Sequence, residues 1–317
     1  MKEYAIGIDL GGTSIKYSVI SKEGEFVFSG ELPSFADISA EAVIKQLLKA
    51  IRECGAFVLK NNLSIKGIGI GTPGIVDEKN RIVLGGAENI KGWENIPLSD
   101  ILEKEVDLPV ILGNDANLMG LGETYYGAAK GVKNTLFITV GTGIGGAVVI
   151  DGKLFGGYAN RGTELGHTPI IANGKPCACG SVGCLETYAS TSAMVTRYIE
   201  SCNEKNITID PQDVNGKHIV DRYKSGDDLA IEVFEEHCNY LGHGIAGFVN
   251  IFSPQRVIIG GGLSEAGDFY LNKIREYASK YWIPDCAYNT SIVRAELGNS
   301  AGSMGACHLV FATLLGR

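Results

Sequence analysis

The sequence predicts an α/β fold, because short apolar runs typical of strands alternate along the chain with amphipathic segments of helical spacing. The 317 residues include 43 glycines, which is about twice the usual share. These glycines gather in short loops after apolar runs rather than in a low-complexity linker. In α/β proteins, turns at the carboxyl ends of strands are where nucleotides bind.

Apolar runs bounded by turn residues predict the strands. In the first half of the chain they lie at residues 4–10, 15–20, 25–30, 65–71, 110–114, 135–140 and 145–150. Residues 39–60 have helical spacing after Ser39, a good N-cap residue, and another helix is expected to begin near Asp115.

From about residue 187 the pattern becomes mainly helical. Strands are expected at 256–260, where the run leads into glycines 260–262, and at 291–297. The predicted helices cover residues 187–201, 227–252, 268–281 and 300–315.

The length of the chain and a similarity between two of its segments predict two domains. A chain of 317 residues is expected to hold about two. Residues 6–13 and 136–143 are each a buried strand that ends in a Gly/Thr turn and leads into a second strand. This similarity indicates a duplicated architecture with a cleft between the two copies.

The composition excludes several classes of protein. The net charge is −8 and no cluster of Lys and Arg stands out, so a nucleic-acid partner is not expected. No apolar run reaches the roughly 18 residues that a membrane span needs, and the N-terminus has no signal-peptide core. We therefore expect a cytoplasmic protein, in which thiols stay reduced and clustered cysteines bind metal more often than they form disulfides.

The turn DLGGT, at residues 9–13, has the residues of a phosphate loop. Gly11 and Gly12 let backbone N–H groups approach an anion, Thr13 adds a hydroxyl donor and Lys16 a nearby positive charge. Asp9, at the end of the predicted strand, can hold a hydrated Mg²⁺. The alternative is a tight hairpin turn whose glycines adopt positive φ.

Two further glycine turns, GTGIGG at 141–146 and GGG at 260–262, offer the same chemistry. Neither is a Walker loop, and no dinucleotide-binding fingerprint opens a helix after the first strand. Three glycine turns that each follow a strand point to a polyphosphate held between two domains.

The sequence GND at 113–115 supplies a candidate general base. Phosphoryl transfer needs positioning, charge neutralisation and a carboxylate that accepts the proton of the attacking alcohol. Asp115 fits that role, and Asn114 could orient the same alcohol. The alternative is structural, since Asp is also an excellent N-cap for the following helix.

A group of cysteines suggests a metal site. Cys177, Cys179 and Cys184 lie within eight positions, and His167 precedes them by ten residues. Together they form a Cys₃His set, which is typical of structural zinc. Glu164 lies three residues before His167, on the same face if that segment is helical. The remaining cysteines are interpreted as small buried hydrophobic residues: Cys54, Cys202, Cys238, Cys286 and Cys307.

Taken together, these motifs resemble the ROK family of repressors, open reading frames and sugar kinases, and within it the bacterial glucokinases. The resemblance extends from residue 4 to about residue 310 and includes GTPGIVD at 71–77 and CACGSVGCLE at 177–186. It implies the actin-like ATPase (ribonuclease H-like) fold, with two α/β domains that close on ATP and a sugar and expel water. We place the small domain at 1–116, completed by the C-terminal helix at about 300–317, and the large domain at 117–299.

The resemblance also implies roles for individual residues. Asp115 corresponds to the catalytic base. The sugar ligands are Gly74, Asn89, Asn114, Asp115, Glu164, His167 and Glu186. The nucleotide ligands are Asp9, Gly11, Gly12, Thr13, Lys16, Gly141, Thr142, Gly143, Gly261 and Gly262. The zinc ligands are His167, Cys177, Cys179 and Cys184.

The expected activity is therefore transfer of the γ-phosphoryl group of ATP to the 6-hydroxyl of glucose, with Mg²⁺ and structural Zn²⁺ as cofactors. The alternatives are a kinase for N-acetylmannosamine, N-acetylglucosamine, fructose or allose, and a sugar-sensing protein without catalysis. Repressors of the family carry a helix-turn-helix domain, whereas only eight residues precede Asp9, so a repressor is not expected. The resemblance also implies a homodimer or higher homo-oligomer.

Overall fold

The computed structural model describes residues 2–316 except residues 78, 80 and 88. Two compact units are distinguished. The first comprises Met1–Lys133, Ala147–Thr163 and Glu296–Arg317, and the second Asn134–Gly146 and Glu164–Ala295. The predicted domains, 1–116 with the C-terminal helix and 117–299, divide the chain at other residues than these two units, and that division stays a prediction. The first unit also takes in the helix that follows Asp115, because that helix packs on the C-terminal helix.

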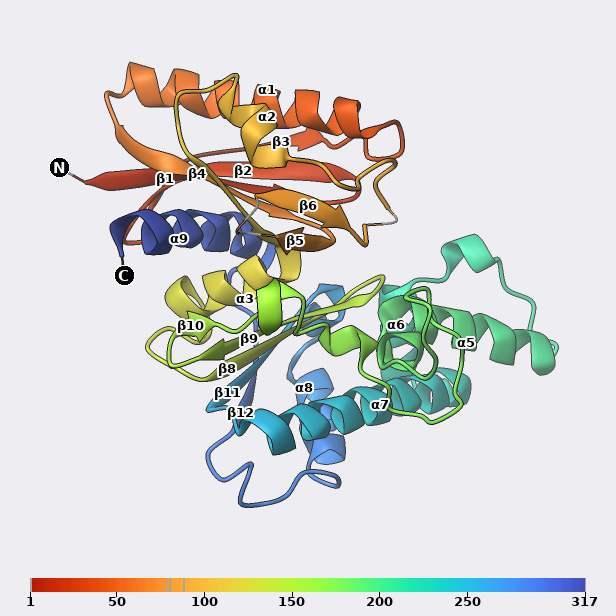
Figure 1. Ribbon diagram of the computed structural model, residues 1–317. Helices are drawn as coiled ribbons and strands as arrows, with labels where there is room; N and C mark the ends of the chain where they lie inside the picture. The colour runs from red at the N-terminus through yellow and green to blue at the C-terminus, as the bar shows by residue number, and fades with distance from the viewer. Residues whose placement is uncertain (1, 78, 80, 88, 317) are drawn as a thin grey trace. The chain divides into compact units, whose positions relative to one another are not determined.

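The first unit is built on a five-stranded sheet with the order β3-β2-β1-β4-β7. Strands β1, β2 and β3 pair antiparallel, whereas β1, β4 and β7 run parallel. The strands are β1 (Glu3–Leu10), β2 (Ser14–Ser21), β3 (Phe26–Pro33), β4 (Ser64–Thr72) and β7 (Val110–Asn114). Helix α1 (Ala40–Lys60) covers one face and α9 (Ala301–Leu315) lies on the other (Figure 1).

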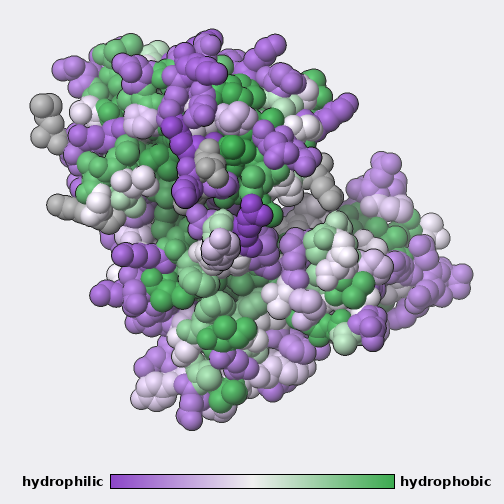
Figure 2. All heavy atoms as spheres, in the orientation of Figure 1, coloured by the Kyte–Doolittle hydropathy of each residue, from purple (hydrophilic) through white to green (hydrophobic). Residues whose placement is uncertain are grey.

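Helix α1 begins where the sequence predicts. The Ser39 side chain accepts a hydrogen bond from the backbone N–H of Ala42 at 3.2 Å, which caps the first turn. Its buried face, which includes Val43 and Leu47, packs into the core formed by β1 and β4. Hydrophilic residues, with hydrophobic ones among them, lie along the edge that α1 forms in the space-filling view (Figure 2).

Helix α3 (Asp115–Tyr126) and α9 cross at unusually close range. A Cβ at Gly122 would lie 2.3 Å from the Ala301 carbonyl oxygen, and one at Gly305 would lie 1.7 Å from that of Leu118. Only glycine permits this approach of two backbones. The buried Glu123 carboxylate accepts hydrogen bonds from the N–H groups of Glu296 and Leu297 at 3.1 and 2.8 Å, which fixes the segment leading into α9.

The second sheet has the order β10-β9-β8-β11-β12, and three of its strands, β8, β11 and β12, lie in the second unit. Its strands are β8 (Thr135–Val140), β9 (Ile144–Ile150), β10 (Lys153–Leu154), β11 (Arg256–Gly260) and β12 (Ser291–Arg294). The helices of the second unit are α4 (Glu186–Ala189), α5 (Thr191–Glu204), α6 (Gly216–Lys224), α7 (Asp228–Phe252) and α8 (Asp268–Ala278). The predicted α/β class is confirmed.

Several elements differ from the prediction. The helix expected at 187–201 is two helices, because Ser190 is extended and caps α5 by accepting from the Ala193 N–H at 3.1 Å. Short elements without a full period were missed: β5 (Ile75–Asp77), β6 (Ile82–Gly85), α2 (Leu98–Glu103), β10 and α6. Among the described residues, no helix combines the length and the apolar character that crossing a bilayer requires.

Candidate functional site

The structure brings the predicted residues together in two sets, one in each unit. In the first unit, the parallel strands β1, β4 and β7 end at the same edge of their sheet. Asp9 lies beside Gly71, Gly71 beside Gly113, and Thr72 beside Asn114. Asp9 and the GND segment therefore share the carboxyl edge of this sheet, which is the usual place for a ligand in such sheets.

Asp9 is a buried carboxylate at this edge. Its side chain is 8% exposed, and burial raises its pKa to about 7, with a further rise from the negative charge of Asp115. Lys16, which is its partner across the β1–β2 pair, opposes that rise. A Cβ at Gly302 would lie 2.4 Å from the Asp9 carboxyl carbon. The first turn of α9 therefore contacts Asp9, and the positive end of that helix favours a carboxylate.

The turn after β1 does not use positive φ. The predicted hairpin is confirmed, because β1 pairs antiparallel with β2. The expected positive φ is wrong, because Gly11 and Gly12 are absent from the positive-φ glycines of the described chain. A Cβ at Gly12 would lie 2.8 Å from the Asn89 amide nitrogen. Ser34 stabilises the turn through two hydrogen bonds. Its hydroxyl donates to the Gly12 carbonyl at 2.9 Å, and its backbone N–H donates to the Thr13 carbonyl at 3.0 Å.

The helix that carries Asp115 is capped by its neighbour. Asn114 is the N-cap of α3, and its side-chain oxygen accepts from the Asn117 N–H at 3.1 Å. The Asn114 amide nitrogen donates to the Gly74 carbonyl at 3.0 Å, which brings Gly74 to the same edge. Asp115 is the first helical residue, and its Oδ1 accepts from the Ala116 N–H at 2.8 Å. The structural alternative for Asp115, that of N-cap, is therefore wrong.

In the second unit, β8 and β11 run parallel and both end in glycine turns. Gly261 has φ +88°, and a Cβ there would lie 2.1 Å from the Val140 carbonyl oxygen. The turn after β8 closes with a hydrogen bond from the Gly141 N–H to the Gly143 carbonyl at 2.9 Å. The structure thus places the glycine turns at residues 141–143 and 261–262 at neighbouring strand ends, as expected for a ligand-binding edge.

Glu186 lies against the first of these turns. It accepts a hydrogen bond from the Ile144 N–H at 2.7 Å, and a Cβ at Gly143 would lie 2.3 Å from its Oε2. Burial raises the pKa of the Glu164 carboxyl, while the charge of His167 lowers it and that of Glu186 raises it, so both residues lie near enough to act on Glu164. These three predicted sugar ligands therefore form one cluster.

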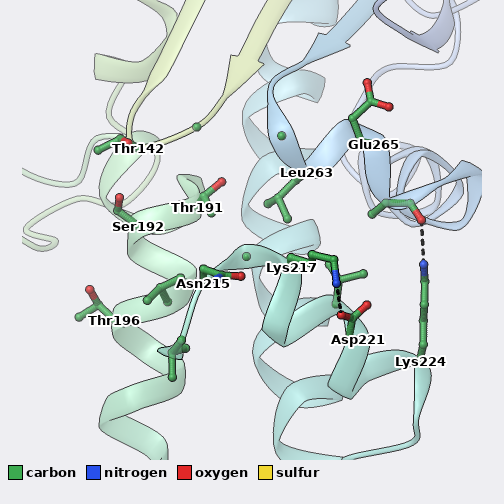
Figure 3. A pocket seen from close by; sticks show the side chains of 17 residues that line it. Thr142, Thr191, Ser192, Thr196, Asn215, Lys217, Asp221, Lys224, Leu263 and Glu265 are labelled. Atoms are coloured by element: carbon green, nitrogen blue, oxygen red, sulfur yellow. Dashed lines mark hydrogen bonds and ion pairs between the residues drawn. The ribbon is translucent and has the colours of Figure 1, made fainter. Parts of the chain in front are cut away.

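A cavity of about 810 Å³ opens beside the same turns (Figure 3). Thr142, Thr191 and Ser192 line one side of it, and Leu263 lies across from them. Its size is within the range of cofactor sites. Much of its remaining lining comes from α6 and from Asn215, the residue before that helix. The Asn215 side chain caps α6 by accepting a hydrogen bond from the His218 N–H at 3.0 Å.

The α6 side of this cavity was missed from the sequence. In the close view, Lys217 pairs with Asp221 at 2.8 Å, and Lys224 donates to the Ala266 carbonyl at 3.0 Å. The segment shows one usable signal, the capping residue Asn215. Its three buried positions are too few for an amphipathic pattern to stand out.

The ligand atoms of His167, Cys177, Cys179 and Cys184 all lie within 4.8 Å of one another. The His167 Nδ1 is 3.6 Å from the Cys177 sulfur, and the sulfurs of Cys179 and Cys184 are 3.7 Å apart. Tetrahedral coordination with metal–sulfur bonds of about 2.3 Å separates two sulfurs by about 3.8 Å. The donor set therefore fits a tetrahedral metal ion.

The turn around this group is firmly held. A Cβ at Gly183 would lie 1.9 Å from the Ile171 carbonyl oxygen, and the Leu185 N–H donates to the Thr168 carbonyl at 2.9 Å. The Cys177 N–H donates to the Ser181 carbonyl at 2.9 Å. The segments before and after the cluster are thus joined, which fixes Glu186 relative to His167.

The other cysteines are free thiols. Cys54, Cys202, Cys238 and Cys307 are buried, as expected of small hydrophobic side chains. The prediction is wrong for Cys286, which is half-buried in the loop after α8.

Comparisons with known proteins agree along the whole chain. A family model described as the ROK family matches residues 5–313. A glucokinase of Halalkalibacterium halodurans is 36% identical over 96% of this chain and 94% of the relative. A crystal structure of a ROK family glucokinase from Streptomyces griseus in complex with glucose and AMPPNP has a TM-score of 0.81 at 32% identity, covering 96% of this chain and 98% of that one. A xylose repressor of Caldicellulosiruptor bescii is 33% identical over 98% of this chain and 78% of the repressor.

Proposed function

The chain belongs to the ROK family, and from this premise we propose that it is an ATP-dependent hexokinase that phosphorylates the 6-hydroxyl of glucose. The observation that carries the proposal is the pair of carboxylates, Asp9 and Asp115, at the shared carboxyl edge of β1, β4 and β7. Full-length similarity to a glucokinase, together with the cluster of Glu164, His167 and Glu186, supports a sugar as the acceptor.

Asp115 would act as the general base. It stands at the start of α3, which Asn114 caps, and its carboxylate would accept the proton of the sugar 6-hydroxyl as that oxygen attacks the γ-phosphorus. Asn114 and Asn89 would position the sugar from the first unit, with Gly74 held nearby by the Asn114 amide.

ATP would bind at the glycine turns. The turns at 11–13 and 141–143 would receive its phosphates through backbone N–H groups, with Lys16 adding a positive charge. The cavity beside Gly262 would hold the adenosine part. Asp9 would hold a hydrated Mg²⁺, which when bound neutralises phosphate charge.

The Cys₃His group would hold a structural Zn²⁺, because three thiolates and one imidazole are a common ligand set for that ion. His167 would bind it through Nδ1, the nitrogen nearest the Cys177 sulfur, which leaves Nε2 to contact a sugar hydroxyl. The metal would thereby position three sugar ligands without taking part in the reaction.

A panel of hexoses tests the proposal directly. With ATP and Mg²⁺, ADP release is expected to be fastest with glucose, and the sugar product is expected to carry phosphate at C6. N-acetylmannosamine, N-acetylglucosamine, fructose and allose serve as competitors in the same coupled assay. Faster turnover of one of these sugars at equal concentration would show that the preferred substrate is another hexose.

A sugar-sensing role is the second candidate, because the xylose repressor is similar over nearly the whole chain. The two functions separate in the same panel. A sensor is expected to bind sugar in calorimetry without releasing ADP, whereas the presence of Asp115 at the start of α3 favours catalysis.

Loss of one proposed zinc ligand is expected to weaken the binding of sugar without affecting the binding of ATP. Cys179→Ser should remove the bound metal, lower the melting temperature and raise the KM for glucose roughly tenfold, while the KM for ATP changes little. Elemental analysis, thermal unfolding and initial rates measure these effects.

Cys286→Ser is the matched control, because Cys286 is a free thiol outside the cluster. It should keep the metal and the parental kinetics. Equal metal content in the parent and the Cys179→Ser variant would contradict the assignment of this ligand.

The homo-oligomeric state and the cytoplasmic location are part of the same proposal. Light scattering on the purified protein measures the first, and a mass of about 34 kDa, that of one chain of 33.7 kDa, would exclude a stable dimer. Fractionation of producing cells measures the second.

A further inference from the structure

The first unit contains a second cavity, of about 370 Å³, whose lining includes none of the residues given a role above. Lys22 follows β2, Tyr125 and Tyr126 end α3, Lys130 lies just beyond, and His308 and Phe311 come from α9. Asp115 is ten residues before Tyr125 on α3, which corresponds to about 15 Å along a helix. A ligand in this cavity would therefore be a second molecule, separate from the reacting sugar.

One wall of the cavity is a set of interlocked rings. The rings of Tyr125 and His308 stack with centroids 3.5 Å apart, and Tyr126 meets His308 edge-on at 5.7 Å. The Tyr126 hydroxyl is 3.3 Å from both the Lys22 carbonyl oxygen and the His308 Nδ1. Burial lowers the pKa of His308 to about 4, so this imidazole is neutral at physiological pH and the aromatic wall carries no charge.

Two lysines supply positive charge at the same cavity. Lys130 forms no ion pair with any residue that the structure describes. Lys22 is 3.6 Å from Glu3, but Glu3 lies closer to Lys66, at 3.2 Å. Glu23 is the single carboxylate in the lining. The lining itself thus carries two positive charges and one negative charge, with Glu3 shared between Lys22 and Lys66, and the ammonium of Lys130 is available to a ligand.

We propose that this cavity binds a small phosphorylated sugar. The ring of the sugar would pack its C–H face on the wall formed by Tyr125, His308 and Phe311, and the phosphate would bind Lys22 and Lys130. The volume is less than half of the 810 Å³ beside the glycine turns, which favours a ligand smaller than a nucleoside triphosphate. The volume is within the lower range of small-molecule sites.

Calorimetric titration of glucose 6-phosphate into the full-length protein tests the proposal. The choice of this probe rests on the proposed function, since it is the product of that reaction. Saturating glucose, Mg²⁺ and a non-hydrolysable ATP analogue occupy the catalytic residues during the titration. One further binding event is expected for the parent protein.

Two variants locate that event. Lys130→Glu should weaken it at least roughly tenfold, because a charge-assisted contact is replaced by repulsion. Ala312→Trp should abolish it by filling the cavity, since Ala312 also lines it. Lys49→Glu is the matched control: Lys49 is an exposed lysine of α1 outside the cavity, so the same charge change should leave binding as in the parent. All three variants should keep the basal turnover of glucose.

Absence of saturable heat in the parent, or equal affinity in the parent and in both cavity variants, would overturn the proposal. Inorganic phosphate that binds as tightly as glucose 6-phosphate would overturn the assignment of a sugar. Failure of the proposed function gives a different result, because it appears as absent turnover in the hexose panel, whereas this titration needs no turnover.

Discussion

Asp115→Asn is expected to lower kcat by a factor of at least ~10² while the protein still binds glucose. The change keeps the size and the helix position of the side chain, because Asn114 remains the N-cap of α3. It removes the only property that the proposed role requires, which is the ability to accept the proton of the sugar hydroxyl. Initial rates at saturating ATP, together with calorimetric titration of glucose, measure the two effects separately.

Asp107→Asn is the matched control for this prediction. Asp107 is an exposed carboxylate of the same unit, so its replacement makes the same change of charge away from the functional edge and should leave kcat unchanged. A near-normal kcat in Asp115→Asn would remove Asp115 from the role of base. Loss of glucose binding together with kcat would instead indicate that Asp115 mainly binds the sugar.

The sequence predicted best those features that depend on local chemistry. Helix α1 begins after Ser39 as predicted, because a capping serine followed by an amphipathic period is a local signal. The Cys₃His set was predicted from residue type and from the resemblance to the ROK family, and the structure brings its ligand atoms within 4.8 Å of one another. Both signals lie within a short stretch of chain.

Features that depend on distant segments were not predictable in the same way. The sequence offered Asp115 as N-cap or base, and the hydrogen bond from the Asn117 N–H to Asn114 shows that Asn114 is the N-cap, while the role of base stays a prediction. The glycines at 122 and 305 are isolated residues in helical patterns, and their purpose appears only where α3 meets α9. Helix α6 lines the cavity beside the glycine turns, yet it buries too few residues for a helical hydrophobic pattern to be recognised in the sequence.

Asp9→Asn is expected to abolish turnover and, at pH 8, to make the folded protein more stable. Burial and the charge of Asp115 raise the pKa of Asp9 to about 7, compared with about 3.9 for an unfolded chain. The folded state therefore holds a proton more tightly than the unfolded state does. This contribution to stability is fully present below about pH 4, decreases as pH rises through about 7, and is lost above it.

The magnitude follows from the same shift. A pKa difference of about three units corresponds to at most about 4 kcal/mol, and the positive end of α9 beside Gly302 offsets part of it. The variant carries no charge at residue 9, so its melting temperature minus that of the parent should be near zero at pH 4 and positive at pH 8. Thermal unfolding across that range, without added Mg²⁺, measures the difference.

Asp37→Asn serves as control, because Asp37 is exposed in the same unit and should show no such trend. A melting temperature for Asp9→Asn that stays at or below the parental value at pH 8 would contradict the prediction. Turnover should fall at least ~10²-fold in the same variant, since the residue proposed to hold a hydrated Mg²⁺ loses its charge. A variant that gains stability as it loses turnover would show that the buried charge is retained for catalysis at a cost to the fold.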